Sequence, residues 1–200
     1  MAKLKLTKNE QKKQKDSLKM FQRYLPTLML KKQQLQAEIR TVEIRITELR
    51  REKEHTDEKF KKWIAIFGEE GVFTPDLLKI TKMVAGEGNI AGVAIPIFEG
   101  AEFETEQYSL IEKPLWLDMA VDNMKKALLL DLQLQCLEEQ QRRLRKELQT
   151  TSQRVNLFEK IKIPEAKANI KKIGVYLGDQ QTAAVVRGKI SKRGMERASQ

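Results

Sequence analysis

The chain has 200 residues, of which 33% are charged, and it carries a formal net charge of +10 with 10 glycines and one cysteine. This composition excludes a disulfide framework and favours long solvated helices over a thick globular core. The sequence has no run of 18 apolar residues and no apolar segment behind its lysine-rich start, so we expect neither a transmembrane helix nor a secretory signal.

The first predicted element is a long helix within residues 1–67, at whose start Thr7 and Glu10 have the spacing of a capping box. From Leu18 to the end of this segment, apolar residues recur at alternating steps of three and four. That period is typical of a coiled-coil seam. Pro26 lies inside the tract and predicts a kink or a local unwinding rather than an end.

The middle of the chain, residues 68–114, predicts a short helix and a small β-hairpin. A Thr-Pro-Asp start indicates the short helix over residues 74–84. Two extended runs then meet at Glu99 and Gly100, which we interpret as the hairpin turn. Pro96 would confine its strand to a sheet edge.

A second long helix is predicted over residues 115–178, followed by residues 179–200 as a basic tail or a helix extension. Its seam runs from Ala120 to Phe158, and four-residue steps near Pro164 predict a local change in the supercoil. Two seams of similar length can pack together and bury each other's apolar side chains. We therefore expect a mainly α, rod-like fold in which the N- and C-terminal helices form a long antiparallel coiled coil.

Strongly polar residues at seam positions include Lys32, Lys53, Asn123 and Gln141. Polar seam residues lower stability but penalise wrong registers, so they can fix how two helices align. The alternative is that they mark a gap where another protein docks.

Positive charge is concentrated at the two ends of the chain. Residues 1–23 carry eight basic against two acidic side chains, and residues 187–200 carry five against one, which accounts for the whole net charge. A basic tip formed from both ends should bind acidic groups of a partner, unless the ends are merely solvated. The candidate contact residues are Lys3, Lys5, Lys8, Lys12, Lys13, Lys189, Lys192 and Arg193.

Catalytic chemistry finds little support in the sequence. One histidine, His55, and one cysteine, Cys136, cannot furnish a standard zinc site, and Gly188-Lys189 lacks the spacing of a phosphate-binding loop. We expect no catalytic residue, no metal and no cofactor. An isoelectric point near 9.6 leaves open a basic coiled-coil module that binds nucleic acid or an anionic surface.

Three stretches carry more specific motifs: the opening Leu-Lys-Leu-Thr-Lys, a Gly-Val-x-x-Pro in the predicted hairpin, and an Arg-Val-Asn followed by Ile-Pro. Their signature positions are Gly92, Val93, Pro96, Arg154, Val155, Asn156 and Pro164. In these motifs and in their order, the chain resembles the D subunit, the central-stalk shaft, of V-type and archaeal-type rotary ATPases.

The resemblance implies a non-catalytic rotor shaft that couples ATP synthesis or hydrolysis in a catalytic hexamer to ion transport. It also implies the partners: the catalytic and non-catalytic nucleotide-binding subunits of the head, a companion stalk subunit called F, and a further protein that links the stalk to the membrane rotor ring. The expected location is cytoplasmic, peripheral to the membrane through the complex.

Overall fold

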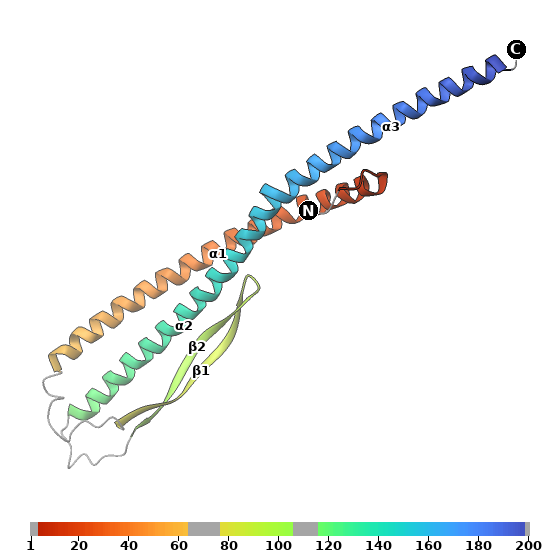
Figure 1. Ribbon diagram of the computed structural model, residues 1–200. Helices are drawn as coiled ribbons and strands as arrows, with labels where there is room; N and C mark the ends of the chain where they lie inside the picture. Colours follow the sequence, from red (N-terminus) through yellow and green to blue (C-terminus); the bar gives the residue numbers. More distant parts are fainter. Residues whose placement is uncertain (1–3, 64–76, 106–115, 199–200) are drawn as a thin grey trace. The chain divides into compact units, whose positions relative to one another are not determined.

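The computed structural model describes residues 4–63, 77–105 and 116–198, which form a helix, a β-hairpin and a second helical stretch in that order (Figure 1). The chain divides into two compact units. Residues 33–149 form the central unit, and residues 1–32 together with 150–200 form the terminal unit. The predicted mainly helical fold with a small antiparallel sheet is confirmed.

The first helix, α1 (Lys8–Trp63), begins where the capping box predicts. The Thr7 hydroxyl accepts a hydrogen bond from the backbone N–H of Glu10 at 3.3 Å, which satisfies one of the free donors of the first turn. The helix continues through Pro26 without an end. Its predicted last residue, Phe67, lies outside the described residues.

Three consecutive helical segments follow the sheet: α2 (Trp116–Asn156), the π-helix η2 (Leu157–Lys162) and α3 (Ile163–Ala198). The irregularity expected near Pro164 lies in η2, where the Ile163 N–H donates to the Phe158 carbonyl, five residues back. A π-turn holds one residue more than an α-turn, so it absorbs the extra residue in the seam. Residues 179–198 are a helical extension of α3.

The hairpin consists of β1 (Leu78–Ile90) and β2 (Val93–Thr105), paired antiparallel. Its loop is Ala91-Gly92, and both residues have positive φ, 51° and 78°. Two such residues make a type I′ turn, whose twist matches that of the strands. The Gly92 N–H also donates to Asn89 Oδ1 at 2.9 Å, which pins the loop.

Two predictions for the middle segment are wrong. Residues 78–84, placed in a short helix, belong to β1, because their β-branched and apolar side chains pair with the far end of β2. Glu99-Gly100 is not the turn. Val84 pairs with Gly100 and Ala85 with Phe98, so Glu99 is the extra residue of a bulge.

Gly88 belongs to strand β1, where the absence of a side chain leaves room for a side chain of β2. A Cβ at this position would come within 2.6 Å of Ile97 Cδ1. Glycine inside a strand often marks such a close approach rather than a break. The edge position predicted for Pro96 is confirmed, since the described sheet has two strands.

The core of the central unit joins both helices to the hairpin. The seam of α1 contributes residues at the predicted spacing, α2 faces it, and one strand residue completes the cluster: Leu35, Ile39, Val42, Ile46, Leu137, Leu144 and Ile95. Leu144 is fully buried. The hairpin therefore acts as a third layer that covers the helix pair of this unit.

In the terminal unit, the start of α1 packs antiparallel to α3. Phe21 contacts Phe158, and Gln11, ten residues earlier in α1, lies beside Gly174, later in the chain. Ala166 and Ile173 of α3 are buried in this unit. Among the described residues, no helix is long and apolar enough to cross a membrane.

Candidate functional site

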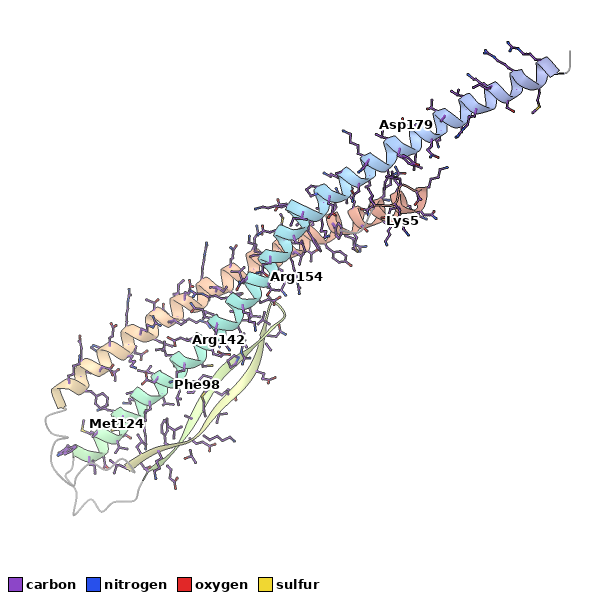
Figure 2. All side chains as sticks on the ribbon, viewed as in Figure 1. Lys5, Phe98, Met124, Arg142, Arg154 and Asp179 are labelled. Atoms are coloured by element: carbon purple, nitrogen blue, oxygen red, sulfur yellow. The ribbon has the colours of Figure 1, made fainter. Side chains whose placement is uncertain are left out.

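The predicted basic contact residues belong to the terminal unit, where Figure 2 labels Lys5 before α1 and Asp179 on α3. Lys3 lies outside the described residues. The side chains of the others are exposed: Lys5, Lys8, Lys12, Lys13, Lys189, Lys192 and Arg193.

These cations form two groups rather than one cluster. The contact between Gln11 and Gly174 places the N-terminal lysines beside the first part of α3. Lys189 is about fifteen residues farther along that helix, which is roughly 22 Å at the α-helical rise. The structure therefore brings the two chain ends into one unit but leaves the second cationic group on the extension of α3.

The extension of α3 is exposed at every residue from Gly178 to Met195. It carries large apolar side chains as well as cations, including Val185, Val186 and Ile190. A solvated tail has no need of such side chains. The mixture is typical of a surface that becomes covered in an assembly.

Three signature positions are explained by the hairpin. Gly92 supplies the second left-handed residue of the turn, and Val93 packs against the core of the central unit. Pro96 has no N–H and so leaves no donor unpaired at its edge of the sheet. Its carbonyl accepts hydrogen bonds from Gln140 Nε2 at 2.6 Å and from Cys136 Sγ at 3.4 Å.

The other signature positions surround the π-helix. Arg154 and Asn156 are exposed at the end of α2, whereas Val155 between them is buried. Pro164 is the second residue of α3 and lacks the N–H that would bond to the carbonyl of Lys160. The wide turn before it accommodates both the missing donor and the added residue.

Sequence reasoning missed the residues of α2 that hold the hairpin. Cys136, Gln140 and Arg143 lie at steps of four and three, on one face of the helix. Besides the bonds to Pro96, Arg143 Nη1 donates to the Ala94 carbonyl at 3.2 Å. The sequence signal that could have identified them is a row of polar residues on one face of the second long helix, which could bond to the predicted edge strand.

Polar contacts fix the register of α1 against α2 in the central unit. Arg50 pairs with Glu138 at 2.7 Å, and Arg145 with Glu43 at the same distance. The two polar seam residues of this region also have partners across the helices: Lys53 with Asp131, and Gln141 with Glu43. The hydrogen bond to Asp131 raises the pKa of Lys53. These pairs favour the register interpretation of the polar seam.

A hollow of about 410 Å³ lies between the hairpin and the helices of the central unit, and Cys136 is part of its wall. Burial raises the pKa of the Cys136 thiol, against hydrogen bonds from Gln140 and the Phe98 backbone. A raised pKa disfavours the nucleophilic thiolate at neutral pH. In the three described ranges, no group of three or more His, Cys, Asp or Glu residues could hold a metal ion.

Comparison with known proteins gives a consistent match over nearly the whole chain. The model of the family of ATP synthase D subunits matches residues 10–193. The V-type ATP synthase D subunit of Borreliella burgdorferi is 51% identical over 192 residues, which cover 96% of this chain and 95% of the relative. The proteins of the same name from Chlamydia trachomatis and Chlamydia pneumoniae are 34% and 33% identical, with 95% and 96% of this chain covered and 95% and 93% of the relatives.

Proposed function

The chain belongs to the family of ATP synthase D subunits, and we propose that it is the non-catalytic central-stalk shaft of a V-type ATPase or ATP synthase. In this role the chain couples ATP synthesis or hydrolysis in the catalytic hexamer to ion transport through a membrane rotor. Its location is then cytoplasmic and peripheral to the membrane.

The observation that carries the proposal is the antiparallel pairing of helices within each unit. A single helix bends and twists easily, whereas two helices locked by a seam and by cross-helix ion pairs resist torsion. In the central unit the lock consists of the buried Leu35-to-Leu144 cluster and the Arg50–Glu138 and Arg145–Glu43 pairs. Such an element can transmit torque.

The exposed extension of α3 supports a place for the terminal unit inside the ring of nucleotide-binding subunits. Its apolar side chains and its cations Lys189, Lys192 and Arg193 face outward all along the helix. A socket that surrounds the helix would cover both kinds of side chain. An asymmetric shaft in this socket presents a different face to each catalytic interface, so its angle biases which site is open.

The remaining partners of the proposal are a companion stalk subunit called F and a further protein that joins the stalk to the membrane rotor ring. Both would bind the parts of the shaft that lie outside the hexamer. The chain contributes no group to ATP chemistry in this account, so its effect on turnover is entirely mechanical.

Reconstitution with a cognate catalytic hexamer tests this function. The purified chain should hydrolyse no ATP alone and should change the hexamer's turnover when added. A basic module that binds nucleic acid would instead retain duplex DNA at physiological salt and leave the hexamer unaffected. Weak DNA binding that is lost by roughly 200 mM salt is expected of the basic ends alone.

A further inference from the structure

The two long edges of the β-hairpin are treated differently by the rest of the central unit. In a hairpin closed by a two-residue loop, the flanking pair, here Ile90 and Val93, exchanges hydrogen bonds, and the pairs alternate from there. The next pair along, Asn89 and Ala94, therefore directs its N–H and C=O groups outward, away from the partner strand.

Two outward carbonyls of β2 already have hydrogen-bond partners. The carbonyls of Ala94 and Pro96 accept hydrogen bonds from side chains of α2, and Pro96 has no N–H to leave unpaired. Strand β2 runs beside α2, as Figure 2 shows and as these hydrogen bonds require. This edge of the sheet is closed to further pairing.

The outward groups of β1 are open. By the same alternation they belong to Ala85, Glu87 and Asn89, whose side chains are exposed. Within the described part of the chain, their outward backbone groups have no hydrogen-bond partner. A regular, unprotected strand edge is a template for another strand.

We propose that the edge of β1 from Ala85 to Asn89 binds an extended segment of another protein, which adds a third strand to the sheet. This inference rests on the proposed function, since the partner belongs to the same complex, and it goes beyond that function by assigning an interaction surface that torque transmission does not require.

Charge argues against a second copy of this chain as the occupant. Glu87 is the charged residue at the centre of the open stretch. Two antiparallel copies, in the register that uses all three open positions, would place one Glu87 directly opposite the other, and like charges in that position are destabilising. A lysine or arginine of a different protein is the complementary occupant.

The neighbouring glycines define the rest of the partner segment. Residues flanking the basic one would project over the opposite face of β1, beside Gly86 and Gly88. Ile97 lies across Gly88 on that face and is 44% exposed. An apolar side chain there would cover it. The expected partner motif is therefore apolar, basic, apolar, in an extended conformation.

Residue-resolved amide hydrogen exchange on the assembled ATPase complex and on the free chain tests the pairing. The outward amides of Glu87 and Asn89 should exchange at least tenfold more slowly in the complex. The inward amides of Gly88 and Ile90, which belong to the ladder in both states, serve as the internal reference. Equal rates at Glu87 and Asn89 in the two states would overturn the proposal.

A proline variant separates strand pairing from simple coverage of the surface. Glu87→Pro removes an outward N–H and leaves the ladder to β2 intact, as native Pro96 does on the other strand. In this variant the protection of Asn89 in the complex should be lost. Glu87→Lys should weaken it as well, whereas Glu102→Lys on β2 should not. Protection that survives Glu87→Pro contradicts a third strand.

A photo-crosslinking residue at position 89 identifies the occupant in the same complex. Cross-links should map to an apolar-basic-apolar segment of a different protein of the complex. A cross-link to a second copy of this chain, or to an acidic segment, would overturn the assignment. ATP turnover of the complex, measured in parallel, reports on the rotor function separately.

Discussion

Phe21 of α1 and Phe158 of η2 meet ring to ring in the terminal unit, with centroids 5.1 Å apart and planes inclined at 44°. The contact joins the start of the first helix to the π-helical turn of the second. The contact therefore links the rotational position of the π-helical residues about their helix axis to the position of α1. Tilted aromatic pairs at this distance contribute about 0.5–1.5 kcal/mol beyond the area that they bury.

A double-mutant cycle on this pair should recover that coupling. Phe21→Ala and Phe158→Ala should each destabilise the chain, and the double variant should cost about 0.5–1.5 kcal/mol less than the sum. Urea denaturation followed by circular dichroism measures all four free energies. Strict additivity would mean that the rings contribute only through their separate burial.

Leu144 should be a principal anchor of the central unit, because its side chain is 0% exposed in the cluster that joins α1, α2 and β2. Leu144→Ala should cost about 2–5 kcal/mol of unfolding free energy, since the site can collapse only partly. Ile44→Ala is the matched control: Ile44 lies on α1 in the same unit but is 59% exposed. It should change stability by less than about 0.5 kcal/mol. Similar losses in both variants would contradict the assigned seam.

Glu139 should contribute a pH-dependent part of the stability. Hydrogen bonds from Arg142 and Arg143 lower its pKa from 4.5 to about 2. Because the folded-state pKa is depressed, the stabilisation is present above about pH 4.5 and is lost as the pH falls toward 2. Both arginines are exposed, so salt should reduce the effect.

Comparison with Glu139→Gln isolates this term. The wild-type chain should be more stable than the variant at pH 6, and the difference should vanish near pH 2. Urea melts at several pH values give the two curves. A difference that stays constant between pH 6 and pH 2 would show that Glu139 acts through packing and not through its charge.

The cations on the extension of α3 should hold the shaft in the hexamer. Changing Lys189, Lys192 and Arg193 to Gln should weaken the binding of the chain to the hexamer. The ATPase activity of the reconstituted complex should then be lost at a lower salt concentration than with the wild-type chain. The control removes three exposed cations from the preceding part of the helical stretch, Lys160, Lys167 and Lys171, and should have less effect. If assembly and turnover were unchanged across ionic strengths, the result would support the alternative that the basic ends are merely solvated and bind no partner.

Local periodicity predicted the long helices because a seam repeats over many turns. The capping box at Thr7 fixed the start of α1, and the steps from Leu35 to Ile46 predicted the buried face of the central unit. The four-residue steps around Pro164 predicted an irregularity of the helix close to the place where the π-helix lies. Each of these signals depends on residues close together in the sequence.

The hairpin could not be predicted as well, because strand pairing joins residues that lie farther apart. Gly86 and Gly88 look like breaks, yet they are strand residues that make room for Glu99 and Ile97 of the partner strand. Glu99 resembles a turn residue but forms a bulge. The role of the polar stripe from Cys136 to Arg143 could not be predicted, because its hydrogen bonds form with a strand that is distant in the sequence.

Rotation of the chain inside a single immobilised catalytic hexamer tests the rotor function most directly. A cysteine introduced at Glu102, an exposed position on β2, would carry the bead, because native Cys136 is only 3% exposed. With ATP present, the bead should turn in one direction, in steps set by the catalytic sites. A hexamer that hydrolyses ATP at its normal rate while the seated chain stays still would contradict the account.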